Sequence, residues 1–211
     1  NSPIAPSRNR IIFMGFLVGF AIPAVWFIML MFLDTRVRSR REIKNAISVP
    51  IVGEIPFDKE YMKRLEEAMS QNTYVPEVSG VWNEAVRILR TNMNFMRKGE
   101  TDNKVITLTS FNESAGKTFV VSNLARSIAN AQKRVLLIDI DIRKGTLSQP
   151  LGRKVQGLSN YLADPSITVD NILHKEFLPN VDLIPAGTIA PNPAELLMSD
   201  RLDALVAQMR D

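Results

Sequence analysis

The sequence contains no cysteine and a single histidine, His174, among 211 residues. Without cysteine the chain can form neither disulfides nor thiolate metal sites. The histidine lies in NILHKEF, where a solvated helix position is expected rather than a catalytic base. The sequence also lacks internal repeats, low-complexity tracts and the interleaved aromatic and basic residues of a nucleic-acid surface. These absences predict that nucleic acid is not a partner.

Charge is absent from residues 11–33, which read IIFMGFLVGFAIPAVWFIMLMFL. At about 1.5 Å per residue, a helix of this length measures roughly 35 Å and exceeds a hydrocarbon core of about 30 Å. A secretory signal has a shorter apolar core of about 7–15 residues that ends at small residues. A basic run follows here instead. The segment is therefore predicted to be one transmembrane helix.

Positive charge is distributed unequally around this segment. The basic residues are Arg8 and Arg10 before it, and Arg36, Arg38, Arg40, Arg41 and Lys44 after it. Because positive charge is retained in the cytoplasm, the part of the chain after the span is predicted to be cytoplasmic. The net charge of +4 comes largely from this cluster, which favours contact with anionic lipid headgroups.

A connector over 34–80 leads into a helix expected over 81–97, and a charged helical stretch is expected within the connector at 59–69. From residue 104 the pattern changes to strand, loop, helix and strand. The first strand is predicted over 105–109, the helix over 117–131 and the second strand over 135–140; later elements are a short helix over 158–162, a strand over 181–184 and helix over 194–209, broken near Ser199. Such alternation predicts an α/β fold with a parallel doubly wound sheet.

Residues 111–118, FNESAGKT, fall between the first strand and its helix. Phosphate groups bind where backbone N–H groups converge at a helix N-terminus. In the P-loop pattern G-x-x-x-x-G-K-[ST], the lysine reaches the phosphates and the hydroxyl ligates Mg²⁺. Phe111 replaces the first glycine of that pattern. The candidate nucleotide-binding residues are Asn112, Glu113, Ser114, Ala115, Gly116, Lys117, Thr118 and Phe119, together with Arg143.

Two carboxylates, Asp139 and Asp141, end the strand at 135–140 in LLIDIDIRKG. Ligands of open α/β sheets bind outside the carboxyl ends of the strands, and period-two alternation directs both side chains to one side. With Thr118 they are predicted metal ligands for Mg²⁺, directly or through water. The alternative is two acids at a solvated strand end. Arg143 could contact phosphate, pair with a carboxylate or be an ordinary surface arginine.

The P-loop followed by LLIDIDIR resembles the Walker A and Walker A′ pair of the bacterial tyrosine kinases (BY-kinases). These are polysaccharide co-polymerases of capsule and exopolysaccharide export, related to the MinD/ParA ATPases. Glu84, Arg87 and Arg90, in NEAVRILRTNMNF, match that family's E-x-x-R-x-x-R oligomerisation motif, which implies a homo-oligomeric ring. Without the resemblance, Glu84 and Arg87 would be interpreted as an ion pair within one helix. PIVGEIP and APNPAELLMSDR also resemble family segments.

The resemblance implies a protein-tyrosine autokinase that uses ATP and Mg²⁺ and regulates polysaccharide polymerisation and export. It would be anchored in the bacterial inner membrane, with 1–10 on the periplasmic side and a P-loop kinase domain over 81–211 in the cytoplasm. Lys117, Asp139 and Asp141 would be catalytic, and one carboxylate would help to deprotonate the tyrosine of a neighbouring subunit. Implied partners are a cognate tyrosine phosphatase and the export machinery.

The sequence departs from the family at several points. The Walker B strand and the tyrosine-rich tail are absent, and Tyr61, Tyr74 and Tyr161 are widely separated. We therefore interpret the chain as a fragment that is catalytically inactive by itself. A non-catalytic chain-length scaffold with a degenerate nucleotide site is one alternative, favoured by Phe111. A MinD/ParA-like ATPase is the other, disfavoured by the membrane span and by Asn112, where such proteins carry an extra lysine.

Overall fold

The computed structural model describes residues 8–33, 39–57, 59–71, 73–74, 80–96, 105–112, 115–152 and 154–210. In chain order the elements are α1 (Arg8–Leu33), α2 (Arg40–Ala46), α3 (Lys59–Ser70), α4 (Val81–Met96), α5 (Lys117–Ala129), β1 (Val135–Ile138), the 3₁₀ turn η1 (Gln149–Leu151), α6 (Leu158–Ala163), α7 (Val169–Ile172), β2 (His174–Leu178), β3 (Val181–Ile184), α8 (Pro193–Leu197) and α9 (Asp200–Arg210). They form two compact units, Asn1–Ile51 and Val52–Asp211. The two units are therefore described separately.

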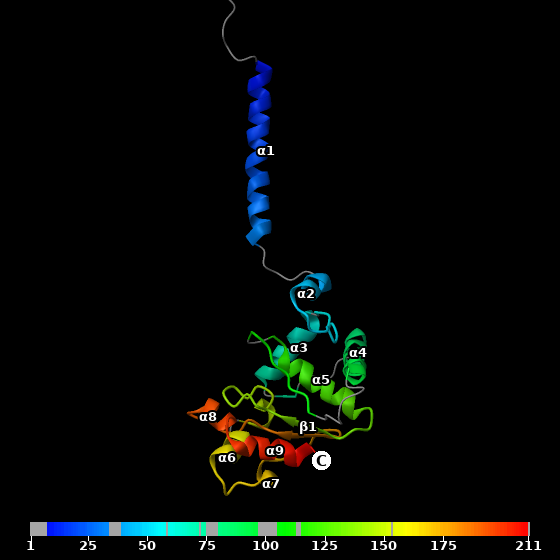
Figure 1. The fold of residues 1–211 in the computed structure, drawn as a ribbon, viewed down its shortest axis with the longest axis vertical. Coiled ribbons are helices and arrows are strands. Elements are labelled where there is room, and N and C mark those ends of the chain that lie inside the picture. The colour runs from blue at the N-terminus through cyan, green and yellow to red at the C-terminus, as the bar shows by residue number, and fades with distance from the viewer. Residues whose placement is uncertain are drawn as a thin grey trace, which may run out of the picture. The chain divides into compact units, whose positions relative to one another are not determined.

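The first unit consists of α1 and the short helix α2 (Figure 1). Helix α1 has 26 residues and buries none of them. Within the described part of the chain it is the one helix long and apolar enough to cross a membrane. Its exposed side chains distinguish it from the buried core helix of a soluble protein. Helix α2 was not predicted; the Ser39 hydroxyl caps it by accepting the Glu42 N–H at 3.4 Å.

The second unit contains a three-stranded sheet in the order β1-β3-β2. β1 and β3 are parallel, with Val135 opposite Val181 and Ile138 opposite Ile184. β2 is antiparallel to β3, and its register is interrupted between His174 and Leu178. The sheet is therefore mixed rather than wholly parallel, while the α/β class predicted from the sequence is confirmed.

Helices cover both faces of this sheet, as Figure 1 shows for α5 on one side of β1 and α9 on the other. Period-two alternation sends successive strand residues to opposite faces. Residues packed on the α5 side are Ala125, Ala129, Leu137, Leu147, Val181 and Leu183, and those on the opposite side include Ile142, Leu158, Tyr161, Ile172, Ile184 and Leu205. The continuous apolar runs of β1 and β3 reflect this burial on two sides.

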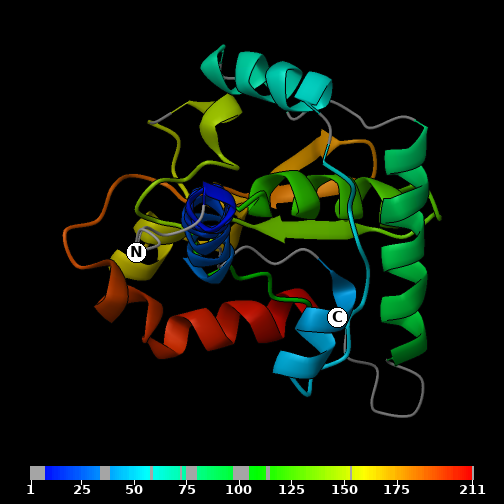
Figure 2. The ribbon, with the colours of Figure 1, turned by 90° about the horizontal axis from the view of Figure 1, so that it is seen from above.

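Helix α4 packs beside α5 at the edge of the unit (Figure 2). Tyr61 of α3, Trp82 of α4 and Phe119 of α5 form an aromatic cluster, with ring centroids 4.9 to 5.1 Å apart. Gly53 lies against α4 so closely that an added Cβ would come within 3.1 Å of the Leu89 side chain. Part of the predicted connector thus belongs to the same compact unit as α4.

Two sequence predictions are wrong. Residues 105–109 form no strand: they lie outside regular secondary structure, and the strands of the described chain pair only among themselves. An apolar run becomes a strand only when a neighbour accepts its backbone hydrogen bonds. His174 begins β2 instead of lying on a helix, because a hairpin turn at Asn180, with φ of 59°, folds the segment back on β3.

Candidate functional site

The P-loop segment ends in a left-handed glycine. Gly116 has φ of +89° and precedes the first residue of α5, Lys117. A side chain at this φ would be strained, so glycine is required for the loop to turn into the helix. The first N–H groups of α5 have no partner within the helix. They are available to an anion at the point where the helix dipole is positive.

The lysine of the P-loop folds back over its own loop. Lys117 Nζ donates to the Ser110 hydroxyl at 2.8 Å, and that hydroxyl donates to the Asn112 carbonyl at 2.7 Å. Asn112, Ala115 and Phe111 are exposed, and the Phe111 side chain is fully so at 103%. Glu113 and Ser114, which were also predicted to bind nucleotide, lie outside the described residues.

Phe119 does not face the P-loop. Its side chain is 6% exposed and packs in the aromatic cluster with Tyr61 and Trp82. Only its backbone N–H remains for a nucleotide, so the predicted contact by this residue is restricted to the main chain. The sequence pattern gave no signal for this anchor, because Tyr61 and Trp82 lie far upstream on two other helices.

The two candidate carboxylates differ in environment. Asp139 follows β1 and its N–H extends the ladder to the Ile184 carbonyl at 2.9 Å. Its side chain is 6% exposed and accepts three hydrogen bonds: the Asp141 N–H at 3.2 Å, the Ser148 N–H at 3.1 Å and the Ser148 hydroxyl at 2.5 Å. Asp141 is exposed and accepts the Lys144 N–H at 3.1 Å. The predicted pair is thus one buried and one solvated carboxylate.

Burial raises the pKa of Asp139 above its ordinary value, and the neighbouring charge of Asp141 acts in the same direction. The hydrogen bonds from Ser148 and from the Asp141 N–H oppose this shift because they favour the ionised form. Ser148 was not predicted, and as an isolated serine seven residues after Asp141 it carries no sequence signal. The structure shows it to be the main polar partner of Asp139.

Residues of α5 and of the turn that follows the two carboxylates line a small pocket. Thr118 and Ser122 of α5 line it from one side, and Thr146 and Leu147 of the turn line it from another. Gly145, in the same turn, lies beside Asp139: a Cβ added to this glycine would be 4.0 Å from Asp139 Oδ2. The metal-ligating threonine predicted from the sequence therefore shares a pocket with the turn that Asp139 closes.

Several predicted site residues do not line that pocket: Lys117, Asp139, Asp141 and Arg143. Arg143 is exposed. No group of three or more histidine, aspartate or glutamate residues that could hold a metal occurs among the residues with described structure. A cation here would need phosphate or water oxygens in addition to Thr118 and Asp141, as Mg²⁺ commonly does. The hydroxyl and carboxylate donors suit Mg²⁺ by their chemistry.

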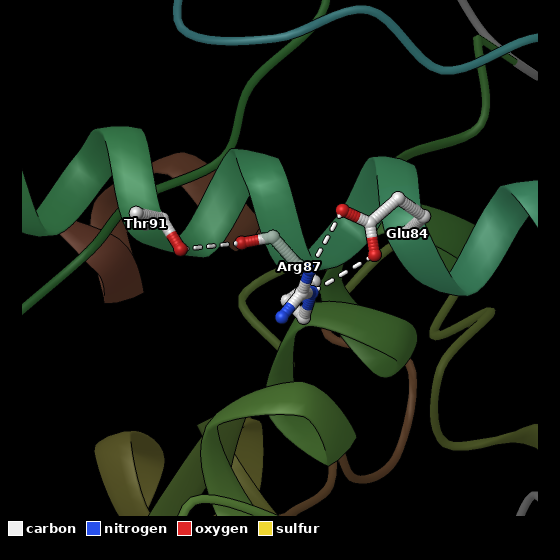
Figure 3. Close-up of polar contacts among 3 residues, drawn as sticks. All are labelled: Glu84, Arg87 and Thr91. Atoms are coloured by element: carbon white, nitrogen blue, oxygen red, sulfur yellow. Dashed lines mark hydrogen bonds and ion pairs between the residues drawn. The ribbon is translucent and has the colours of Figure 1, made fainter.

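The residues of the predicted oligomerisation motif lie on α4, and Figure 3 shows two of them, Glu84 and Arg87. Glu84 accepts two hydrogen bonds at 2.9 Å from the guanidinium of Arg87, one turn later. This bond lowers the pKa of Glu84. Both side chains are more than half exposed, at 51% and 63%. Arg90 instead donates to the Ser127 carbonyl of α5, so it ties two helices of the same chain together.

Comparison with known proteins identifies the family. The profile of the CobQ/CobB/MinD/ParA nucleotide binding domain matches residues 106–209. The chain is similar to the tyrosine-protein kinase wzc of Salmonella typhi, with 46% identity over 125 residues, 59% of this chain and 17% of that protein. The chain thus spans a small part of the length of this relative.

Two solved structures are similar over more of their length. The BceF tyrosine kinase domain has a TM-score of 0.71 and 33% identity, covering 82% of this chain and 72% of that one. The kinase domain of the Escherichia coli tyrosine kinase ETK has a TM-score of 0.70 and 30% identity, covering 83% and 70%. These matches confirm a P-loop NTPase-like α/β fold, and the chain belongs to the bacterial tyrosine kinase (BY-kinase) family.

Proposed function

We propose that this chain is the nucleotide-binding part of a membrane-anchored protein-tyrosine autokinase that uses ATP and Mg²⁺. The observation that carries the proposal is the left-handed Gly116, which presents Lys117 and the free N–H groups of α5 to a phosphate chain. Kinase family membership supplies the reaction class. A triphosphate needs a cation and convergent N–H donors. We propose ATP as the ligand because the site offers the N–H groups of α5 and the oxygen ligands for a cation.

In this proposal Lys117 exchanges its hydrogen bond with Ser110 for the phosphates. Thr118 and Asp141 would hold Mg²⁺, which would neutralise phosphate charge, and Asp139 would order the turn beside them. Asp139 or Asp141 assists removal of the proton from the incoming tyrosine. Phosphoryl transfer depends chiefly on positioning and charge neutralisation, and these residues supply both.

The second part of the proposal concerns assembly. The Glu84 and Arg87 side chains are exposed on α4 and can exchange their mutual ion pair for one with another subunit. We assign the ring contact to these two residues. Arg90 supports it from within the chain by fixing α4 on α5 through Ser127. The tyrosine acceptor would come from a neighbouring subunit of the ring.

The third part concerns location. We propose that α1 spans the bacterial inner membrane, with 1–10 periplasmic, 34–80 as a cytoplasmic linker and 81–211 as the cytoplasmic kinase domain. The length of α1 supports the span, and the basic residues of α2 support the orientation. Arg36 and Arg38 lie outside the described residues. A cognate tyrosine phosphatase and the capsule or exopolysaccharide export machinery are the proposed partners.

The test is autophosphorylation of the intact protein, purified in detergent and incubated with radiolabelled ATP and Mg²⁺. Lys117→Met is expected to lower the rate about 10²–10³-fold, as loss of one charge-stabilising group does. Lys133→Met is the matched control: Lys133 is an exposed lysine in the turn after α5, and its replacement should leave the rate unchanged.

Three results would contradict the proposal. Wild-type protein that binds Mg-ADP without forming phosphotyrosine would favour a non-catalytic scaffold, for which the exposed Phe111 in the first glycine position is the supporting observation. Release of inorganic phosphate without phosphotyrosine would favour a MinD/ParA-like ATPase. Equal rates for the two lysine variants would remove Lys117 from the site.

A further inference from the structure

Ser148 binds one oxygen of Asp139 with both of its donors. The Ser148 N–H lies 3.1 Å and its hydroxyl oxygen 2.5 Å from Asp139 Oδ2. Both residues are buried, with 8% and 6% of their surfaces exposed. A buried carboxylate oxygen with two donors from one residue cannot rotate without breaking both bonds. Ser148 therefore fixes the orientation of Asp139.

The Ser148 hydroxyl is itself fixed by a third contact. It carries one proton, which it donates to Asp139, and its oxygen accepts the Ala186 N–H at 2.8 Å. Ala186 lies in the loop directly after β3. The hydroxyl thus connects the residue that follows β1 to the loop that follows the neighbouring strand.

This loop is in turn held by the start of α6. The Ser159 N–H donates to the Ala186 carbonyl at 2.9 Å, and the Ser159 hydroxyl donates to the Thr188 carbonyl at 2.6 Å. The backbones approach closely: a Cβ at Gly187 would lie 2.5 Å from Asn160 Oδ1. Because these hydrogen bonds hold the loop against α6, the Ala186 N–H directs the Ser148 hydroxyl from a defined place.

We propose that Ser148 is a positioning residue for the metal-nucleotide site, acting through Asp139 and anchored by Ala186. The inference rests on the proposed nucleotide-binding function. Ser148 occupies Oδ2 of Asp139. The other oxygen, Oδ1, accepts the Asp141 N–H at 3.2 Å. Ser148 thereby orders the backbone that carries Asp141, the exposed carboxylate assigned to Mg²⁺.

The test measures the affinity of the intact protein in detergent for a fluorescent ADP analogue, with Mg²⁺ and with EDTA. Partners that orient metal ligands are worth about 10–100-fold in metal affinity. Ser148→Ala is therefore expected to reduce the Mg²⁺-dependent gain in affinity by about tenfold or more. Its affinity in EDTA should match that of wild type, because Lys117 and the α5 N–H groups are unchanged.

Ser159→Ala is the matched control. Ser159 is also a buried serine, and its contacts do not include Asp139. Alanine at this position removes only the hydroxyl bond to Thr188 and keeps the backbone N–H that holds Ala186. The variant should lose thermal stability and keep the full Mg²⁺-dependent gain. A merely structural role for Ser148 predicts the same behaviour for both variants. Ser148→Thr retains the hydroxyl and should restore the gain, and Ser148→Cys, a weaker donor, should be intermediate.

The outcomes separate this inference from the kinase proposal. Equal Mg²⁺-dependent gains in Ser148→Ala and Ser159→Ala would overturn the role of Ser148 even if wild type phosphorylates tyrosine. If Ser148→Ala does not fold, full gain in the cysteine variant would overturn it. A selective loss in Ser148→Ala supports it even if no phosphotyrosine forms. Wild type that binds no ADP under either condition would overturn both.

Discussion

The two halves of the candidate site are held by different forces. The start of α5, which carries Lys117, is anchored by apolar packing of Phe119 against Tyr61 and Trp82. The turn after β1 is closed by hydrogen bonds to the Asp139 carboxylate. Apolar packing is non-directional and depends on volume. Buried hydrogen bonds are directional and penalise the loss of a single partner.

This difference predicts which substitutions each half tolerates. The half at the start of α5 should accept another apolar side chain of similar volume in place of Phe119. The carboxylate half should be sensitive to an isosteric change that alters only one donor or acceptor. The exposed P-loop residues contribute little to the apolar packing or to the buried hydrogen bonds. Lys117 can therefore exchange its hydrogen-bond partner at little cost to the stability of the fold.

Phe119→Ala should have the largest effect on the stability of the unit. Removing a buried phenyl ring costs about 3–5 kcal/mol, whereas Phe119→Leu, which keeps most of the volume, should cost about 1.5 kcal/mol or less. Urea unfolding of the 211-residue chain in detergent measures both. A Trp26→Phe background leaves Trp82 as the one tryptophan reporter within those 211 residues. Equal losses in the two variants would show that ring stacking, rather than volume, anchors α5.

Asp139→Asn should have the next largest effect. The substitution is isosteric, but one side-chain oxygen becomes an NH₂ group that must face the donors of Ser148 or the N–H of Asp141. A buried donor left without an acceptor costs about 1–3 kcal/mol. Asp141→Asn, on an exposed side chain, should change the free energy of unfolding by about 0.5 kcal/mol or less. Comparable unfolding midpoints for the two variants would contradict the distinction between the carboxylates.

The contrast also explains what could be predicted from the sequence. The helices at α4, α5 and α9 and the strands β1 and β3 follow from apolar spacing, and the predicted break near Ser199 falls between α8 and α9. These elements depend on burial, which hydrophobic periodicity reports directly. The motif around Gly116 was also visible, because a glycine before Lys-Thr at a helix start has a specific backbone role.

Features that depend on a distant partner could not be predicted. β2 contains His174, Lys175 and Glu176, and a charged edge strand has little apolar signal. Residues 105–109 have the composition of a strand but pair with none of the described strands. Ser148 has its role through Ala186, which is 38 residues away in the chain. The roles assigned to Lys117, Thr118, Asp139, Asp141 and Arg143 stay predictions.

Tyr61→Phe should have the smallest effect at neutral pH, and it separates packing from hydrogen bonding within the aromatic cluster. The ring is 2% exposed, and its hydroxyl forms a hydrogen bond with Asn123 of α5. Phenylalanine keeps the ring contacts with Trp82 and Phe119, so only one hydrogen bond of about 1 kcal/mol is lost. The expected change in unfolding free energy is correspondingly small.

A pH series then gives this variant a distinct signature. Burial raises the pKa of Tyr61 above its ordinary value of 10.0. Below that pH the tyrosine is neutral in both folded and unfolded chains and its contribution is complete. Above it, the unfolded chain releases the proton while the folded chain retains it, so the stability supplied by Tyr61 falls as pH rises. The advantage of wild type over Tyr61→Phe should therefore shrink above about pH 10. An advantage that is constant through this range would show that the hydroxyl is solvated and that packing alone holds the cluster.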